Sequence, residues 1–457
     1  MPPQRRIDLV LDSVKRLLRI GATANLGNIL QKQHPADLAQ IFGELPDRDR
    51  VAAFSVLLER NSRLAMETLS ELGHEAAAAL LAGRSAEEIA KLVQEMPPDD
   101  AAALIDKLPD ELSSAVLELM GRKASGEVEN LLEYAEQTAG RIMNPNVFAL
   151  AEDITVGEAI TALQSSRDVE MVFYLYIVDA RRHLVGVTSL RRLLLVSPET
   201  PLKRIMTLEP TSARVDMDQE EVARLVASYN LLAIPVVDES NKLVGLITVD
   251  DIIDVIKDEA TEDLYRLAGV SSDERVFTPA GESLRKRMPW LIVNLATAFM
   301  AAAVVGIFQN TISAWVALAV FMPIVAGMGG NAATQTLTVI VRGIALGELT
   351  WGNSRKALNK ELLVGIGNGL VVGTIAALIA WVMNGDPKLG IILALAMVVN
   401  LFVAGLAGTL IPLGLKAMKV DPALASAVFI TTFTDVAGFA SFLGLATLFL
   451  RYFHRAG

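Results

Sequence analysis

From Met288 to the C-terminus the sequence consists mostly of long apolar runs, and these runs constrain the fold more than any other feature. Each run is long enough to cross a hydrocarbon layer of about 30 Å as an α-helix. Lipid offers the backbone no hydrogen-bonding partner, so helices are the expected form. We therefore predict five transmembrane helices, at residues 289–307, 312–341, 362–383, 389–415 and 423–450.

Charge divides the chain at the same place. The formal net charge of −11 splits into −15 for residues 1–288 and +4 for residues 289–457. A basic surface for nucleic acid is absent, and the excess acid of the first part favours a cation as partner. The absence of Cys excludes disulfides, thiolate metal sites and thiol chemistry. The N-terminus lacks a basic-then-apolar signal segment, so we expect the soluble part to stay in the cytosol.

The basic residues of the membrane region predict its orientation, because loops rich in Lys and Arg stay on the cytosolic side. They precede the first predicted span and follow the second and the fourth. They are Arg285, Lys286, Arg287, Arg342, Arg355, Lys356, Lys360, Lys416 and Lys419. An odd number of spans then leaves the N-terminus inside and the C-terminus outside.

Asp435 is the one charged residue of the last apolar run. At about 1.5 Å per helical residue it lies near the middle of the bilayer, roughly thirteen residues into the run. Placing a carboxylate there costs roughly 3 kcal/mol, so we expect a cation or a proton to use it. The alternative is a structural carboxylate that is hydrogen-bonded between helices.

The second predicted span is dense in helix breakers and polar residues. They are Pro323, Gly327, Gly329, Gly330, Asn331, Thr334, Gln335 and Thr336. One interpretation is a broken helix along an aqueous path, where freed carbonyls and the side-chain oxygens of Asn331 and Gln335 would meet Mg²⁺ or its water shell. The other is close helix packing by small residues. Gly365, Gly369 and Gly373, at four-residue intervals in the third span, are interpreted as a packing face.

One Asp435 per chain cannot neutralise a divalent ion. Two copies that meet at a twofold axis would present two carboxylates, which favours a homodimer with an axial pore. Mg²⁺ keeps several waters and suits a site with one or two carboxylates, whereas Ca²⁺ takes more protein oxygens. Oxygen ligands alone leave Ca²⁺, Mn²⁺ and Co²⁺ open.

Two copies of one pattern occupy residues 143–256. YIVDARRHLVGVTSLRRLLL in the first copy aligns with PVVDESNKLVGLITVDDIID in the second, and each predicts strand, turn, strand and helix. These in-register copies resemble a tandem CBS pair, a regulatory α/β module. Upstream, residues 5–137 repeat short amphipathic helices, which predicts a stacked helical superhelix rather than an enzyme. The four histidines, expected in turns or on the surface, are His34, His74, His183 and His454.

Acidic residues crowd the second copy and its exit. They are Asp216, Asp218, Glu220, Glu221, Asp250, Asp251, Asp254, Asp258, Glu259, Glu262 and Asp263. A solvated acidic face is one interpretation. The other is a sensor in which facing acidic domains repel each other until divalent cations bridge them. A helix from about residue 252 to residue 267 would then link this sensor to the first span.

The order of these segments, together with GMGGNAATQT, TVDDIIDVIKDEATED, DPALAS and TTFTDVAGF, closely resembles the MgtE family of magnesium channels. The resemblance implies a multidomain chain with a helical N domain at 1–140, CBS domains at 141–204 and 205–257, a plug helix at 258–285 and a five-helix pore domain at 286–457. It also implies a homodimeric, Mg²⁺-selective channel of the bacterial inner membrane, closed when cytosolic Mg²⁺ is abundant.

The resemblance also implies roles for individual residues. Asp435 matches the pore aspartate, and Gly330, Asn331 and Gln335 are expected to line the conduction path. Asp421 matches an acidic residue at the cytosolic pore mouth. The regulatory Mg²⁺ ligands that it implies are Asp99, Asp218, Glu220, Asp251, Asp254, Glu259, Glu262, Asp263 and Asp421.

The sequence departs from the family at three positions. The family can carry a carboxylate at Asn230 and at Ala103 and an Asn at Thr334, so one interdomain cation site is expected to be weaker here. Some CBS pairs of the family bind adenine nucleotide, and Gly245 and Thr248 resemble such a nucleotide-binding turn.

Three functions follow. The first is a gated Mg²⁺ channel, a two-state equilibrium that cytosolic Mg²⁺ biases toward closure. The second is a proton- or sodium-coupled cation exporter, which would call for a second carboxylate inside the membrane, and the predicted spans contain none. The third is a membrane-bound cation sensor that does not transport, which leaves Asp435 without a role.

Overall fold

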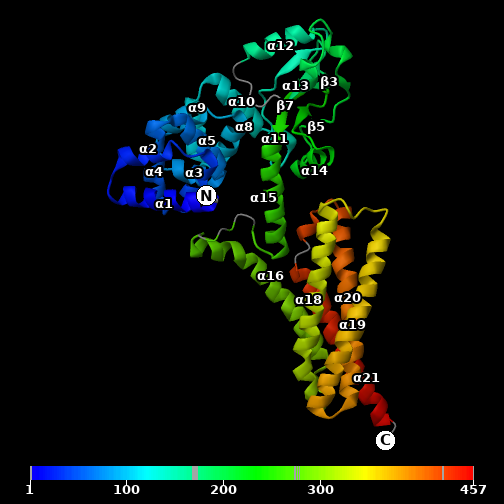
Figure 1. Cartoon of the computed structure of the whole chain (residues 1–457). Helices are drawn as coiled ribbons and strands as arrows, with labels where there is room; N and C mark the ends of the chain where they lie inside the picture. The colour runs from blue at the N-terminus through cyan, green and yellow to red at the C-terminus, as the bar shows by residue number, and fades with distance from the viewer. Residues whose placement is uncertain are drawn as a thin grey trace. The chain divides into compact units, whose positions relative to one another are not determined.

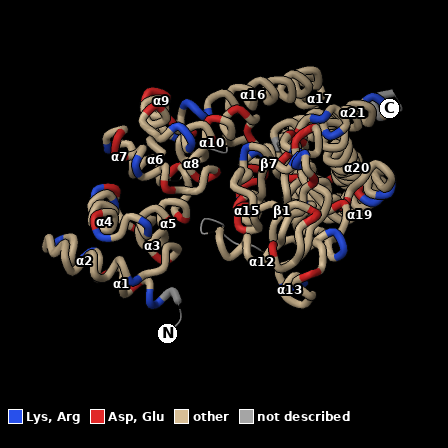
Figure 2. Tube along the Cα trace, turned by 90° about the horizontal axis from the view of Figure 1, so that it is seen from above, with Lys and Arg blue, Asp and Glu red and all other residues tan. Residues whose placement is uncertain are grey.

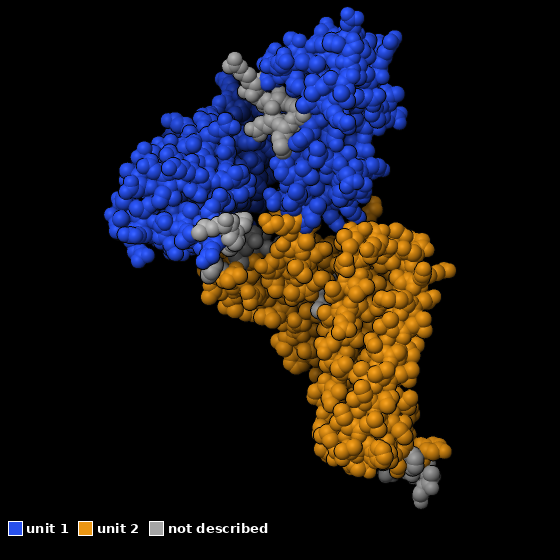
Figure 3. Space-filling model, in the orientation of Figure 1, with its two compact units in different colours: residues 1–256 blue, residues 257–457 orange. Residues whose placement is uncertain are grey.

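The computed structural model describes residues 3–166, 173–271, 274, 276, 278–424 and 427–455. The chain divides into two compact units, Met1–Ile256 and Lys257–Gly457, which Figure 3 shows in different colours. The first unit carries the helical domain and the CBS pair, and the second carries the membrane helices (Figure 1). The helical, CBS-containing, five-span architecture is the one predicted from the sequence.

Ten helices fill residues 3–132, all of which the structure describes. Alternate helices pack on each other, as α3 does on α5 and α6 on α8, so the domain is a stack with a continuous apolar core. Local signals begin the helices: Ser85 and Glu88 form a capping box, and Pro98 opens α8. The helices are α1 Pro3–Arg19, α2 Thr23–Leu30, α3 Pro35–Gly43, α4 Asp47–Arg60, α5 Ser62–Leu72, α6 His74–Leu81, α7 Ala86–Val93, α8 Pro98–Asp106, α9 Asp110–Leu119 and α10 Arg122–Leu132.

The CBS pair consists of two related sheets. In the first, β1 runs parallel to β2, and β3 and β4 follow antiparallel; in the second, β5 runs parallel to β6 and β7 is antiparallel. The elements are α11 Ala139–Ile142, β1 Ala149–Ala151, α12 Val156–Ser165, β2 Tyr174–Val178, β3 Leu184–Ser189, α13 Leu190–Leu194, η1 Leu202–Arg204, β4 Thr207–Leu208, β5 Ala213–Arg214, α14 Gln219–Tyr229, β6 Ala233–Val237, β7 Leu243–Thr248 and α15 Val249–Leu267. Strand, turn, strand and helix recur in register, as the internal repeat predicted.

The two CBS copies interlock through glycines. A Cβ on Gly186 would lie 2.7 Å from the sulfur of Met206, and one on Gly245 would lie 2.5 Å from the sulfur of Met143. Each glycine of one copy therefore receives the methionine that begins the other. Gly245 is required for this packing, whatever its part in nucleotide binding.

The second unit contains five helices that are long and apolar enough to cross a membrane. A short helix, α17, lies between the first two and ends before Trp315, so the predicted start of the second span at residue 312 is wrong. The described helices are α16 Ala280–Ile307, α17 Gln309–Ala314, α18 Ala317–Ala345, α19 Ser354–Asn384, α20 Pro387–Ala417, η2 Pro422–Leu424 and α21 Ala427–Arg455.

The prediction of a broken second span is also wrong, because α18 is continuous through Pro323 and the glycines that follow. Gly329 packs against the side chain of Asn400, and a Cβ on Gly330 would lie 3.2 Å from Thr431. In a bilayer the backbone has no water to bond with, so these glycines keep the helical ladder and provide close contacts instead. The packing interpretation is the correct one for Gly329 and Gly330.

The glycine stripe of α19 is a packing face, as predicted. A Cβ on Gly365 would lie 2.5 Å from the Leu401 carbonyl oxygen, and one on Gly369 would lie 2.6 Å from Val398 Cα. Gly373 is equally close to Ala394. Any larger side chain would therefore push α19 away from α20.

Candidate ion-conduction and regulatory sites

Asp435 lies on α21, directly after the fully buried Thr434. The apolar window of this helix is Val428–Tyr452, so Asp435 lies about 8 Å from its centre, nearer its start than the predicted mid-bilayer position. Its carboxylate is half-buried and has no hydrogen-bond or ion-pair partner among the described residues. The alternative of a carboxylate bonded between helices therefore lacks a partner in the described part of one chain.

A polar row lies along one exposed face of α18. Asn331, Gln335, Thr338 and Arg342 are all exposed, at helical spacings that place them on one side. The amides of Asn331 and Gln335 have no side-chain partner within the described ranges. Unpaired amides are costly against lipid, so this face calls for water or another protein surface.

Gly330 connects the α18 motif to the helix of Asp435. It packs on Thr431, which lies four residues before Asp435 and therefore on the same side of α21. The structure thus places the predicted pore segments on two helices that pack against each other, with Gly330 at their contact and Asn331 and Gln335 on the exposed side of α18.

Asn400 is a buried amide that the sequence analysis missed. It lies in α20 between Gly329 and Gly438, and its Nδ2 donates to the carbonyl of Val325 at 2.8 Å. Its Oδ1 is buried and has no hydrogen-bond partner among the described residues. A single amide in the middle of an apolar span was the available signal. Asn400 joins α20 to both α18 and α21.

Glu361 corrects the expectation that the membrane region lacks a second buried carboxylate. It lies in α19, one residue before the predicted span, and is only 4% exposed. Thr336 Oγ1 donates to Glu361 Oε2 at 3.0 Å, and Lys360 Nζ lies 2.5 Å from Oε1. The Lys360 ammonium neutralises this carboxylate, in contrast to Asp435.

A first regulatory cluster joins the helical domain to the CBS pair. Asn144 donates to Asp99 at 3.2 Å, Ser70 donates to Asp100 at 2.7 Å, and Thr248 Oγ1 donates to Asp251 at 2.6 Å. Burial raises the pKa of Asp99 well above its usual range, and the negative charge of Asp251 raises it further. Burial also raises the pKa of Asp251 to about 6. Like charges are thus held together here at a cost, which a cation would relieve.

The structure does not gather every predicted regulatory ligand. Asp218 is the N-cap of α14 and accepts from the Glu220 backbone at 2.8 Å, and Glu220 lies 3.9 Å from Arg224. Asp254 is exposed on α15. Within the described residues, no group of three His, Asp or Glu side chains is arranged to hold a metal ion.

Two of the departures from the family have local explanations. Asn230 ends α14 in the left-handed conformation, with φ 51°, which Asn tolerates better than most residues. Ala103 is half-buried on α8, the helix that carries Asp99. Thr334 donates to the Gly330 carbonyl at 3.0 Å within α18.

A second regulatory cluster lies in the membrane unit, where the end of α15 meets the loop before α21. Arg266 forms ion pairs with both Glu262 and Asp421. Burial raises the pKa of Asp263 to about 6, and the charges of Asp421 and Glu259 add to the shift. Figure 2 shows the acidic residues along α15. Arg266 was missed, although its position four residues after Glu262 was a signal.

The fold defines a polytopic membrane protein with a cytosolic-type regulatory module, and comparison with known proteins identifies the family. Family models match at residues 33–137 (MgtE intracellular N domain), 139–199 and 202–258 (CBS domain) and 322–445 (the MgtE divalent cation transporter). The chain is 38% identical to the magnesium transporter MgtE of Enterococcus faecalis over 72% of its length and 73% of that protein. It is 37% identical to that of Bacillus subtilis, covering 72% and 74%. The chain belongs to the MgtE family.

A solved structure resembles the soluble part. The cytosolic domain of the Mg²⁺ channel MgtE in complex with ATP shares 35% identity with this chain, covers 54% of it and 99% of that domain, and superimposes with a TM-score of 0.51. The relatives are named as transporters, and the shared region includes the helical domain and the CBS pair.

Proposed function

We propose that this protein is a Mg²⁺-selective channel that mediates magnesium uptake and closes when Mg²⁺ binds to its soluble unit. The observation that carries the proposal is the unpartnered carboxylate of Asp435 inside an apolar helix. A permanent negative charge there attracts a cation and repels anions. The family relationship supports Mg²⁺ as that cation, and the small number of carboxylates suits an ion that keeps part of its water shell.

The pore is proposed to lie on the twofold axis of a homodimer. Two Asp435 carboxylates would balance one divalent ion, and the exposed amides of Asn331 and Gln335 would face the axis or its water. Because the chain has no Cys, a single Gln335→Cys substitution gives an unambiguous cross-linking test. Oxidation should produce a covalent dimer of the full chain. The matched control is Val382→Cys on α19, which is 85% exposed and should not cross-link.

The gate is proposed to combine the two regulatory clusters. Mg²⁺ between Asp99 and Asp251 would relieve their repulsion and hold the helical domain against the CBS pair. Mg²⁺ at Glu259, Asp263 and Asp421 would hold α15 against the loop before α21. Loss of Mg²⁺ from both clusters would favour the open state, since ligand shifts the equilibrium only by its unequal affinity for the two states.

Flux into liposomes tests the proposal. The full chain and its Asp435→Ala variant would be reconstituted without a pH or sodium gradient, at low and high Mg²⁺ on the side of the soluble unit. We expect passive Mg²⁺ flux that high Mg²⁺ suppresses and Asp435→Ala abolishes. Flux that needs a proton or sodium gradient would favour the exporter, and absence of flux under every condition would favour the sensor.

Adenine nucleotide is a second proposed ligand, because the related cytosolic domain was solved with ATP. The proposed site includes Thr248, whose hydroxyl bonds to Asp251, so nucleotide and the first regulatory cluster would share a residue. Calorimetric titration of the full chain with ATP, with and without Mg²⁺, tests this. Thr248→Val should weaken binding, and an unchanged affinity would remove Thr248 from the site.

The proposed location is a bacterial inner membrane with the N-terminus in the cytosol. The basic residues at the start of α19 and the end of α20 support it. Reporter fusions at the two ends of the chain test it: a reporter active only outside the cytosol should work at the C-terminus and fail at the N-terminus.

A further inference from the structure

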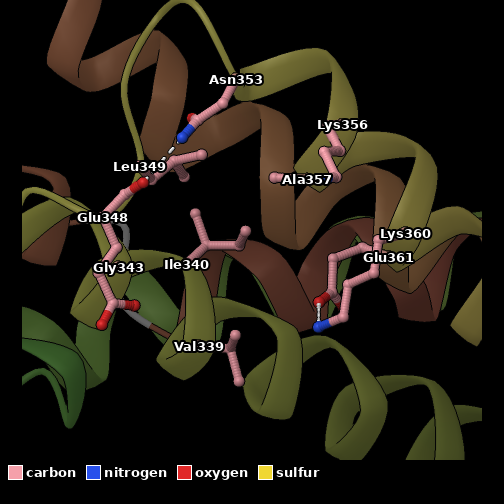
Figure 4. A pocket seen from close by; sticks show the side chains of 10 residues that line it. All are labelled: Val339, Ile340, Gly343, Glu348, Leu349, Asn353, Lys356, Ala357, Lys360 and Glu361. Carbon is pink, nitrogen blue, oxygen red and sulfur yellow. Dashed lines mark hydrogen bonds and ion pairs between the residues drawn. The ribbon is translucent and has the colours of Figure 1, made fainter.

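A groove of about 300 Å³ lies between the end of α18 and the start of α19 (Figure 4). Its floor is apolar and includes the buried Ile340 and Leu349. Val339, at the deeper end of α18 in this groove, is 53% exposed. The connecting loop also exposes Trp351, a residue type that anchors proteins at the membrane interface. The groove therefore joins an apolar surface to the polar boundary of the membrane.

Two unpaired charges of opposite sign line the groove. Lys356 and Glu348 are both exposed, and neither side chain has a partner among the described residues. Figure 4 shows Glu348 on one side and Lys356 on the other, with Leu349 and Ile340 between them. Lys360 adds no net charge because it pairs with Glu361. The groove thus offers one cation and one anion across an apolar floor.

The loop that forms one wall is held in place by its own backbone bonds. Asn353 Nδ2 donates to the Glu348 carbonyl at 2.8 Å, and the Thr350 amide donates to Asn353 Oδ1 at 2.8 Å. Lys416 of α20 donates to the Leu349 carbonyl at 3.3 Å. The separation of the two charges is therefore built into the loop before any ligand binds, which lowers the ordering cost of binding.

We propose that this groove binds a phospholipid with a zwitterionic phosphoethanolamine headgroup. The lipid phosphate pairs with Lys356, the primary ammonium pairs with Glu348, and an acyl chain lies along Ile340 and Val339. A purely anionic headgroup satisfies Lys356 and is repelled by Glu348. A quaternary ammonium has no N–H to donate to Glu348, so phosphatidylcholine is the weaker ligand. The inference requires only the membrane placement of α18 and α19 and is independent of the ion that is transported.

Native mass spectrometry of the full chain tests the proposal. The detergent-solubilised protein would be titrated with phosphatidylethanolamine, phosphatidylglycerol and phosphatidylcholine that carry identical acyl chains. We expect preferential retention of phosphatidylethanolamine, with Lys356→Ala weakening it about fivefold. Glu348→Ala should erase the preference over phosphatidylglycerol. Equal retention of the three lipids by the wild-type chain would overturn the proposal.

Two controls keep the test sharp. Arg355 neighbours Lys356 but does not line the groove, so Arg355→Ala should leave the preference unchanged. If Arg355→Ala acts as strongly as Lys356→Ala, the effect is general surface charge and the site is refuted. An excess of soluble phosphoethanolamine should not displace the lipid, and displacement would identify a headgroup-only site for a soluble phosphate compound. A groove that instead receives a second copy of the chain would lose dimer, not lipid, on Val339→Trp.

Discussion

Two carboxylates in the membrane unit lie in similar local positions and have opposite surroundings. Asp435 and Glu361 each lie about two helical turns from the start of their helix. Glu361 is almost fully buried and is bonded to Lys360 and Thr336, whereas Asp435 is half-buried and has no partner among the described residues. Pairing, rather than burial, therefore separates a structural carboxylate from one that is available to a cation.

The largest expected effect concerns transport. Asp435→Asn keeps the size of the side chain and removes its charge, so about 3 kcal/mol of cation stabilisation is lost and Mg²⁺ uptake should fall by about 100-fold. Glu361→Gln should retain most of the uptake, because its amide oxygen still accepts from Thr336. Growth of a bacterial strain that lacks its own magnesium transporters measures both. Equal loss in the two variants would break the distinction between the carboxylates.

The next effect concerns stability and reverses the order of the two sites. Glu361→Ala leaves the buried Thr336 hydroxyl without its acceptor, while the exposed Lys360 can still reach water. We expect a loss of about 2 kcal/mol in stability, measured as a lower Tm in detergent. Asp435→Ala should leave the Tm unchanged or raise it. A larger loss for Asp435→Ala would mean that Asp435 has a structural partner.

A third prediction extends the comparison to the soluble unit, where like charges are held together without a counter-ion. Asp251, with a folded-state pKa of about 6, and Asp99, with a raised pKa, bind protons more tightly when folded than when unfolded. Their contribution to stability is therefore fully present below about pH 4 and is lost as the pH rises through about 6. Added Mg²⁺ should restore it at neutral pH.

Chemical denaturation of residues 1–256 at several pH values measures this effect. The double variant Asp99→Asn, Asp251→Asn should flatten the pH dependence and remove the response to Mg²⁺, and Asp153→Asn, which changes an exposed carboxylate of the same unit, is the matched control. An unchanged pH slope in the double variant would show that the two carboxylates are not coupled to folding.

The smallest effect concerns Arg266, which contacts Glu262 and Asp421 where a divalent ion is proposed to bind. Arg266→Gln removes a competing cation. The Mg²⁺ concentration that half-closes the channel should then fall about threefold, since partly exposed ion pairs contribute less than about 1 kcal/mol. Flux measured at graded Mg²⁺ tests this. A higher closing concentration would show that Arg266 supports the closed state.

The sequence predicted the features that repeat or that break a pattern. The CBS pair follows from its in-register copies, the α19 packing face from its glycine spacing, and Asp435 from a charge in an apolar run. Glu361 was missed because it adjoins Lys360 at the end of a run, where charged residues normally reach the headgroups. The continuity of α18 was missed because Pro and Gly break helices in water, where the freed backbone groups find partners that a bilayer does not provide.

Contacts between distant segments could not be predicted from local patterns. Asp99 and Asp251 belong to different domains, and only the docking of the helical stack on the second CBS copy brings them together. The same holds for Arg266 and Asp421, and for Asn400 between two glycines of other helices. In each case residue type indicated chemistry and the fold selected the partner.

The central claim is that Asp435 serves a passive Mg²⁺ pathway. The most direct test is the current across a planar bilayer that contains the full chain, with equal pH and sodium on both sides and a Mg²⁺ gradient. The account predicts a current that reverses at the Mg²⁺ equilibrium potential and disappears in Asp435→Asn. A reversal potential that follows the proton or sodium gradient, or an undiminished Mg²⁺ current in the variant, would contradict it.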